Sequence, residues 1–360
     1  MRASQPMNKI LVINPGSTST KIAVYEDHKQ VLLEVIRHTA EEIGRYEKIA
    51  DQYEFRKKLI EDKLHEHGIC EKDFAAIIGR GGMVRPLESG VYNVNEKMLY
   101  DLRNCIHSAE HASNLGGLIA YEMAQTIGCP AFIADPVAVD ELSDVARISG
   151  LPELPKRSIF HALNHKAIAR RYATEHNTQY ESLNLIVVHM GGGVSVGAHK
   201  HGRVVDVNQA LDGWGPFSPE RAGTLPAGDL VKLCFSGKYT QAEIKKMLAG
   251  KGGFYAHLGT TDAREVDKMV ENGDKKAALI LEAFCYCITK DIGAMLLAMQ
   301  EKTDAVLLTG GIAYDHLVVD YIKKYVEPFA PVHVYPGEDE MGALADCALR
   351  ALNGEETKVY

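Results

Sequence analysis

Several short stretches of this chain combine small residues with hydroxyl, basic or acidic side chains, a combination that can bind phosphate. The first is Asn14-Pro-Gly-Ser-Thr-Ser-Thr-Lys21, which follows the apolar run Ile10–Ile13. Small residues let the backbone approach an anion, hydroxyl and N–H groups donate to its oxygens, and a lysine adds charge. We therefore expect Ser17, Ser19 and Lys21 to contact a phosphate group.

A second stretch of the same kind lies in the later half of the chain. The apolar run Leu185–Val188 leads into His189, Met190 and the triplet Gly191-Gly192-Gly193. A glycine triplet costs chain entropy, and close approach of the backbone to a phosphate is one reason for it. Neither stretch matches the P-loop pattern or the strand-to-helix G-x-G-x-x-G fingerprint, so both of those nucleotide folds are disfavoured.

Charged side chains and further glycines follow other predicted strands. Arg80 lies among glycines after the strand 74–78, where a guanidinium can hold a small anion with two hydrogen bonds. Asp135 follows the strand 131–134, at the strand end where open α/β sheets bind ligands. Asp135 is therefore a candidate for Mg²⁺ binding, as is the group Glu338-Asp339-Glu340, unless these carboxylates are solvated or cap helices. The turn Gly310-Gly311, between a predicted strand and a helix, could place a nucleotide against the helix N-terminus.

Two pairs of histidines, His107 with His111 and His161 with His165, are four residues apart and could share a helix face. Zinc ligation is disfavoured, because no third ligand pattern such as H-E-x-x-H accompanies them and the chain has 15 histidines. A histidine that donates to a transferring phosphoryl group fits the neighbouring anion-binding stretches better. A zinc hydrolase is accordingly the weakest of the functions considered.

The elements that position these residues form an internal repeat. A three-strand meander over residues 10–36 recurs later in the chain, with Gly16 falling on Gly191. Such a repeat predicts duplicated domains, each continuing into mixed helices and strands, and the Pro-rich segment 151–155 marks the boundary. The predicted elements are helix 40–67, strand 74–78, helix 115–127, strand 131–134, helices 164–176, 227–235, 265–272 and 275–300, strand 305–308, helix 313–326, strand 332–335 and helix 341–352.

Composition excludes several classes of protein. A chain of 360 residues with 46% hydrophobic and 24% charged residues is neither disordered nor fibrous. A net charge of −8 disfavours nucleic acid as the main partner. Because the N-terminal segment lacks the features of a signal peptide and no stretch reaches about 18 apolar residues, we expect a soluble, cytoplasmic protein without a membrane partner. The seven cysteines are an odd number without C-x-x-C, which predicts free thiols.

Together these segments resemble the acetokinase family of the actin-like ATPase superfamily, to which sugar kinases and Hsp70-type ATPases also belong. The resemblance spans nearly the entire chain, and its segments follow in the order of the family. They are INPGSTSTK, the glycine-flanked Arg80, His111-Ala-Ser-Asn114, Phe160-His161 with His165, His189-Met-Gly-Gly-Gly193, Arg221-Ala-Gly-Thr-Leu-Pro226, Thr261-Asp-Ala-Arg264 and Gly310-Gly-Ile312.

The resemblance implies an α/β fold of duplicated actin-like (ribonuclease H-like) domains, each a mixed β-sheet with flanking helices, with a cleft between them. The N-terminal domain would comprise residues 1–153 plus a returning helix, 341–360. The C-terminal, nucleotide-binding domain would comprise residues 154–340. Active-site residues would come from both domains.

Roles for individual residues follow from the same resemblance. Asn14, Arg221 and His161 would act at the transferring phosphoryl group. Arg80 would bind the carboxylate of the acid, with Arg85 as the alternative, and His111 would lie close to the acyl pocket. Asp135 would act on the acceptor and Mg²⁺, and Asn14 with Glu340 (or Glu338) would bind the metal. Gly82 would open the acyl pocket, because acetate kinases carry a valine at this position. The residues implied for nucleotide binding are His189, Gly191, Gly192, Gly193, Asp262, Arg264, Gly310 and Gly311.

The expected function is reversible transfer of the γ-phosphoryl group of ATP, with Mg²⁺, to the carboxylate of a short-chain fatty acid, butyrate being the expected substrate. A kinase for acetate, propionate or a branched-chain fatty acid is the alternative within the family. A non-catalytic actin-like nucleotide switch and a sugar kinase are the alternatives outside it. We expect a homo-oligomer, at least a dimer, that uses only small-molecule substrates.

Overall fold

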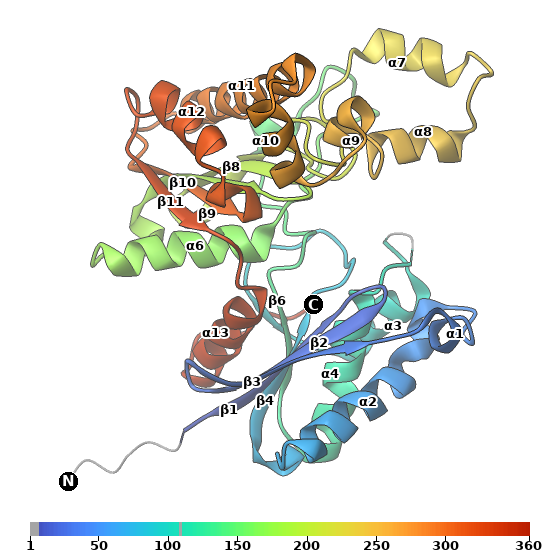
Figure 1. Cartoon of the computed structure of the whole chain (residues 1–360). Helices are drawn as coiled ribbons and strands as arrows, with labels where there is room; N and C mark the ends of the chain where they lie inside the picture. Colours follow the sequence, from blue (N-terminus) through green and yellow to red (C-terminus); the bar gives the residue numbers. More distant parts are fainter. Residues whose placement is uncertain (1–6, 108–109) are drawn as a thin grey trace. The chain divides into compact units, whose positions relative to one another are not determined.

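A computed structural model describes residues 7–107 and 110–360 of the chain (Figure 1). The chain divides into two units that are described separately below. Unit 1 is Met1–Val139 together with Asp339–Tyr360, and unit 2 is Asp140–Glu338. Within the described residues no helix is both long and apolar enough to cross a membrane. All seven cysteines are free thiols, as predicted.

The sheet of unit 1 has six strands in the order β3-β2-β1-β4-β6-β5. The first three form the predicted antiparallel meander, and β4 and β6 then add in parallel beside β1. Strand β1 contains the apolar run Ile10–Ile13 and is buried almost throughout, because both faces of the sheet are covered by helices. The strands are β1 (Lys9–Pro15), β2 (Ser19–Glu26), β3 (Lys29–Arg37), β4 (Phe74–Arg80), β5 (Val91–Asn93) and β6 (Ala131–Ala134).

Helices α4 and α13 cover opposite faces of this sheet, both over β1 and β4 (Figure 1). The approach of α4 to β4 is close, since a Cβ atom on Gly79 would lie 2.1 Å from the carbonyl oxygen of Gly116. Glycine is therefore required there for packing. The helices of unit 1 are α1 (Ala40–Ile43), α2 (Tyr53–Glu66), α3 (Glu96–Asn104), α4 (Asn114–Ile127) and α13 (Glu340–Leu352), with 3₁₀ turns η1 (Ile49–Gln52) and η2 (Glu71–Asp73).

The sheet of unit 2 repeats the strand order of unit 1. Its order is β11-β10-β7-β8-β9, with the meander β7-β8-β9 antiparallel and with β10 and β11 parallel beside β7. When β7 is matched to β1, the strands β9, β8, β7, β10 and β11 correspond in order to β3, β2, β1, β4 and β6 of unit 1, which confirms the duplicated fold. Only β5 is additional among the described residues. The strands are β7 (Asn184–Met190), β8 (Val194–Lys200), β9 (Arg203–Val207), β10 (Ala305–Gly310) and β11 (Val332–Pro336).

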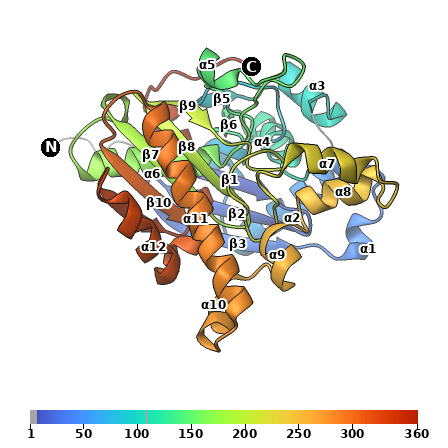
Figure 2. The same cartoon turned by 90° about the horizontal axis from the view of Figure 1, so that it is seen from above.

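Alternate residues of β7 face two separate cores in unit 2. Ile186 and Val188 pack with α11, whereas Leu185 and Val187 pack with α6. Figure 2 shows α11 crossing the strands of this sheet, with α10 near its N-terminal end. The helices are α5 (Asp144–Arg147), α6 (Ala162–Glu175), α7 (Ala227–Cys234), α8 (Gln241–Leu248), α9 (Gly253–Leu258), α10 (Ala263–Glu271), α11 (Lys275–Ala298) and α12 (His316–Val326), with 3₁₀ turns η3 (Tyr180–Ser182) and η4 (Gly311–Tyr314).

Two predicted helices are interrupted in the structure. The helix predicted over 40–67 is divided, because Gly44 ends α1 and a 3₁₀ turn precedes α2. The helix predicted over 313–326 begins only at His316, because Asp315 caps α12 and separates it from the 3₁₀ turn η4. Both interruptions depend on local capping, which the apolar periodicity does not report.

The units divide earlier in the chain than the predicted boundary at 153/154. Unit 2 begins at Asp140, because the next residues are bound to it. The carboxylate of Glu141 accepts from Lys166 Nζ at 2.8 Å and from the backbone N–H of Val204, and the backbone N–H of Ser143 donates to Val205. The Pro-rich segment 151–155 thus lies within unit 2 rather than at its edge.

Candidate active site

In unit 1, three predicted site residues lie together at the end of β1. The Nδ2 atom of Asn14 donates to Glu340 Oε2 at 2.8 Å, although the two residues are 326 positions apart in sequence. Arg80, the last residue of β4, pairs with the same carboxylate, with Nη2 at 3.1 Å from Oε1. Strands β1 and β4 and the first turn of α13 therefore bring an amide, a guanidinium and a carboxylate to one place.

The alternatives to Arg80 and Glu340 lie elsewhere. The guanidinium of Arg85 stacks 4.7 Å from the ring centroid of Tyr360. Glu338 belongs to unit 2, where Oε2 lies 3.6 Å from Nε2 of His189. The sequence left open the choice between Arg80 and Arg85 and the choice between Glu340 and Glu338. In the structure, Arg80 and Glu340 lie beside Asn14.

Asp135 follows β6 and is buried, with its backbone in the left-handed region at φ 39°. Its Oδ1 atom accepts from the hydroxyl of Ser89 at 2.6 Å and from the backbone N–H of Gly90 at 2.8 Å. A non-glycine residue with positive φ stores strain, and such strain concentrates at functional sites. The carboxylate organises the turn at Ser89 and Gly90, and no contact with Arg80 or Glu340 is recorded among the described residues.

Replacing Asp135 with asparagine separates a role in metal binding from a role in the turn. Asparagine has nearly the same volume, tolerates positive φ and keeps one acceptor oxygen, so the fold should persist. We expect kcat to fall at least tenfold and the Mg²⁺ titration to shift to higher concentration. Ser89→Ala is the matched control, since it removes one hydrogen bond but keeps the charge. An unchanged Mg²⁺ titration, or equal losses in both variants, would assign Asp135 to the turn alone.

His111 lies just before α4. The backbone N–H of Ser113 donates to its Nδ1 atom at 3.2 Å, so the neutral ring carries its proton on Nε2. Desolvation by the surrounding chain and the Arg80 cation lower the pKa of His111, although the residue as a whole is exposed. His111 therefore favours its neutral form close to Arg80.

The space expected beside Gly82 is not present. A Cβ atom on Gly82 would lie 2.6 Å from Oδ1 of Asn114 and 2.8 Å from Cδ2 of Leu102. Oδ1 of Asn114 is itself held by the backbone N–H of Met83 at 2.8 Å. The interpretation of Gly82 as an opening for a longer acyl chain is therefore wrong, since this glycine permits close packing against α4. A Gly82→Val variant should lose activity on every acid.

In unit 2, two predicted site histidines stack on one another. The rings of His161 and His189 are 3.9 Å apart between centroids and inclined by 15°. His189 is buried, and its Nδ1 atom donates to Oδ1 of Asn164 at 2.8 Å. Burial and the nearby Arg221 cation lower the pKa of His189 to about 3, so the ring is neutral at pH 7.

Behind His161 runs a buried chain of hydrogen bonds. Tyr180 Oη is 2.7 Å from Nδ1 of His199, and Nε2 of His199 is 3.1 Å from Nδ1 of His165. The Ser195 hydroxyl lies 2.8 Å from both Nε2 of His165 and Nδ1 of His161. The phenol is the stronger donor at one end, and a hydroxyl has only one proton to donate. We infer that each group donates toward His161, so that Nδ1 of His161 accepts from Ser195 and Nε2 carries a proton.

The buried histidines should make the stability of the protein depend on pH. Burial lowers the pKa of both His165 and His199 well below the usual value of about 6.5, as it does for His189. The unfolded chain then binds more protons below pH ~6.5, so stability is complete above that pH and falls as the pH decreases toward about 3. Each group contributes up to about 1.4 kcal/mol per pH unit.

Thermal unfolding between pH 8 and pH 5 measures this effect. We expect a constant midpoint down to about pH 6.5 and a progressive decrease below it. A variant of an exposed histidine, His65→Gln, should show the same profile. A midpoint that stays constant to pH 5 would mean that the histidines are protonated in the folded protein.

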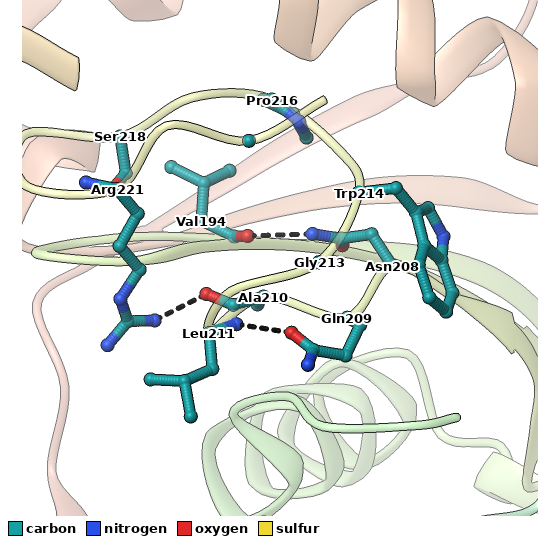
Figure 3. A pocket seen from close by; sticks show the side chains of 11 residues that line it. Val194, Asn208, Gln209, Ala210, Leu211, Gly213, Trp214, Pro216, Ser218 and Arg221 are labelled. Atoms are coloured by element: carbon teal, nitrogen blue, oxygen red, sulfur yellow. Dashed lines mark hydrogen bonds between the residues drawn. The ribbon is translucent and has the colours of Figure 1, made fainter. Parts of the chain in front are cut away.

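Arg221 lies at the edge of a shallow pocket in unit 2, opposite Trp214 (Figure 3). Its Nη1 atom donates to the carbonyl oxygen of Ala210 at 2.6 Å. A Cβ atom on Gly193 would lie 1.9 Å from the same nitrogen, so the glycine leaves room for the guanidinium. The pocket is lined by Val194, Asn208, Gln209, Ala210, Leu211, Gly213, Trp214, Pro216, Ser218, Arg221 and Gly223.

The predicted nucleotide residues of unit 2 lie at turns and at a helix N-terminus. Asp262 caps α10 and pairs with the exposed guanidinium of Arg264, with Nη2 at 2.7 Å. Gly310 has φ 89°, and a Cβ atom there would lie 2.3 Å from the carbonyl oxygen of Met190. At Gly311, a Cβ atom would meet nothing within 4 Å. Gly310 is thus fixed by the backbone, and Gly311 faces open space.

The residues at the end of β1 fit a magnesium site in part. Mg²⁺ binds one or two carboxylates and completes its shell with water and substrate phosphates, for which Glu340 is suitable. Asn14 presents Nδ2 rather than an oxygen to that carboxylate, and Arg80 already offsets its charge. No cluster of three or more acidic, histidine or cysteine ligands occurs in the described part of the chain. A metal held here would depend on the phosphates of the nucleotide.

Several residues that hydrogen-bond to the site histidines, directly or through one another, were not predicted as site residues. Asn164 orients His189, and Ser195 and His199 connect to His161. Ser195 and His199 alternate on β8 with apolar residues, which is a recognisable signal for polar groups facing one side of a buried strand.

Comparison with known proteins places the chain among kinases. The acetokinase family matches residues 154–333. A "Probable butyrate kinase" of Clostridium botulinum (strain Alaska E43 / Type E3) is 57% identical over 353 residues, which cover 98% of this chain and 99% of that protein. A second "Probable butyrate kinase", from the strain Eklund 17B / Type B, has the same identity and coverage.

Solved structures agree on the fold. Acetate kinase from Porphyromonas gingivalis superposes with a TM-score of 0.78 at 19% identity, covering 96% of this chain and all of that one. A propionate kinase from Francisella tularensis subsp. tularensis SCHU S4 gives 0.77 at 20% identity, with 95% and 99% covered. The fold is thus the one that these acetate and propionate kinases share. The chain belongs to the acetokinase family.

Proposed function

We propose that this protein transfers the γ-phosphoryl group of ATP reversibly to the carboxylate of butyrate, giving butyryl phosphate and ADP. The observation that carries the proposal is the 57% identity to two proteins named as butyrate kinases over nearly the whole chain. A kinase for acetate, propionate or a branched-chain fatty acid is the alternative, and Gly82 gives no support for either.

In unit 1, Arg80 would hold the carboxylate of the acid. A guanidinium binds a carboxylate through two parallel N–H donors, which fixes both position and orientation. A carboxylate is already a nucleophile at pH 7, so positioning and charge stabilisation can carry phosphoryl transfer. Glu340 and Asn14 would hold Mg²⁺ on the phosphates, where the ion supplies positive charge.

In unit 2, Arg221 and His161 would act on the phosphoryl group. Arg221 is cationic, and the proton that we assign to Nε2 of His161 makes that ring a hydrogen-bond donor. His189 supports His161 by stacking. The glycines at 191–193 and 310–311, with Asp262 and Arg264, would bind the nucleotide, since glycine allows the backbone to approach phosphate.

The test is an assay of ADP release and of acyl phosphate formation with acetate, propionate, butyrate, valerate and isobutyrate. If the acyl chain is buried, each methylene contributes ~0.8 kcal/mol, so two favour butyrate over acetate by about 15-fold in kcat/KM. A preference for acetate would move the assignment to an acetate kinase. Release of ADP without any acyl phosphate would favour a nucleotide switch. The accompanying proposal is a cytoplasmic homo-oligomer, and gel filtration with light scattering tests its oligomeric state.

A further inference from the structure

Arg56 is a buried cation of unit 1 that lies outside the group formed by Asn14, Arg80 and Glu340. It lies in α2 in phase with Ile60 and Leu64, on the helix face that packs inward, and is 1% exposed. Its recorded hydrogen bonds all go to uncharged groups, and among the described residues no carboxylate forms an ion pair with it. A buried charge without a partner of opposite sign is costly, so this arrangement needs a cause.

The guanidinium of Arg56 binds the turn between β1 and β2. Nη1 donates to the backbone oxygens of Gly16 at 2.7 Å and Ser19 at 3.1 Å, and Nη2 donates to the backbone oxygen of Ser17 at 3.2 Å. The fork also reaches Gln52 Oε1, with Nε at 3.1 Å and Nη2 at 2.8 Å. One buried side chain therefore donates hydrogen bonds to three carbonyl groups of the turn.

The remaining backbone groups of the turn complete this pattern. The carbonyl of Thr18 accepts from the backbone N–H of His38 at 2.9 Å, and the N–H of Gly16 donates to Ser19 at 2.7 Å. For the backbone N–H groups of Ser17 and Thr18, no acceptor is recorded among the described residues, and both residues are exposed. Successive outward N–H groups of this kind form a concave site for an anion.

We propose that Arg56 is a positioning residue that turns the carbonyl groups of the 16–19 turn inward and its N–H groups outward, and that a phosphoryl group bound at those N–H groups is its counter-ion. The guanidinium does not touch this ligand, because the turn lies between them. The inference rests on the proposed role of the turn in binding phosphate. Its test measures anion binding rather than turnover.

The geometry also predicts which substitution is informative. Burial lowers the pKa of Arg56 to about 10, so the side chain is still cationic at pH 7. A lysine would keep the charge, but a single ammonium group cannot reach the carbonyls of Gly16, Ser17 and Ser19 together. Arg56→Lys therefore keeps the positive charge but removes the multiple donors of the guanidinium, and Arg56→Met removes the charge and the donors. Arg45, an exposed residue paired with Glu41, provides matched Arg45→Lys and Arg45→Met controls.

The experiment is a titration with inorganic phosphate at constant ionic strength, followed through the backbone amide resonances of Ser17 and Thr18. We expect saturable shifts of both amides in the wild type and in the Arg45 variants. Arg56→Lys should raise the apparent Kd for phosphate at least tenfold, and Arg56→Met should raise it further. In turnover, the KM for butyryl phosphate should rise in Arg56→Lys while the KM for butyrate stays within twofold, a split that general destabilisation would not produce.

Wild-type amides of Ser17 and Thr18 that do not respond to phosphate would overturn the inference without any variant. So would a folded Arg56→Lys protein with the wild-type Kd. If Arg56→Met does not fold, the wild-type titration and Arg56→Lys decide the question. Amides that respond in a protein without kinase activity on any acid would refute the proposed function and leave the anion site standing.

Discussion

Arg221→Ala is expected to lower kcat by roughly 10²–10³ and to change the KM for ATP little, because the lost charge acts mainly on the transition state. The side chain is largely buried at the edge of the unit 2 pocket, where Nη1 donates to the carbonyl of Ala210 at 2.6 Å. Steady-state kinetics with ATP and butyrate provide the measurement. A variant that keeps more than half of the wild-type kcat would remove Arg221 from the mechanism.

Gly193 offers a second way to test the same guanidinium without removing it. A methyl group in Gly193→Ala would lie 1.9 Å from Nη1 of Arg221 and must displace it, so we expect a loss of kcat in the same direction. Gly228→Ala is the matched control, because a Cβ atom there meets nothing within 4 Å and the residue lies in α7. Equal activities in the two variants would show that the position of Arg221 is not critical.

Arg80→Ala is expected to raise the KM for the acid by about 10- to 100-fold, because a charged hydrogen-bonded partner is worth roughly 1.5–3 kcal/mol. The Mg²⁺ concentration required should fall, since Glu340 loses the guanidinium that lies 3.1 Å from its Oε1 atom and offsets its charge. Initial rates over a matrix of acid and Mg²⁺ concentrations measure both effects.

Arg85→Ala is the control for Arg80→Ala. Arg85 stacks on Tyr360, so its removal should affect the packing of the C-terminal residue and leave the KM for the acid within twofold. If Arg85→Ala raises the KM and Arg80→Ala does not, Arg85 binds the acid and the assignment of Arg80 is wrong.

The repeat and most of the elements could be predicted, because apolar periodicity is a property of the chain itself. The meanders, α6 and α11 occur within a few residues of their predicted bounds. The short strand β5 and the helices α3, α5, α8 and α9 were not predicted. Strand β5 has three residues and is defined by its pairing with β6, which the sequence does not display.

Site residues could be predicted where the side chain itself carries a charge or a polar group that can bind a ligand. Asn14, Arg80 and Glu340 do lie together, but Gly82 was misinterpreted because a glycine can equally provide space for a ligand or for packing. Arg56 was overlooked in a helix rich in charge. Its position four residues before Ile60, on the same face, is the signal that could have identified it.

The return of α13 to unit 1 has a consequence for synthesis of the chain. All of unit 2 is synthesised before Asp339–Tyr360. Synthesis of unit 2 takes roughly 10–40 s at about 5–20 residues per second. Throughout that interval the face of β1 and β4 that α13 covers is open, and Asn14 has no Glu340 to bind. The nascent N-terminal segment therefore exposes the apolar surface of this sheet until α13 has been made. Unit 2, continuous in sequence, can fold first.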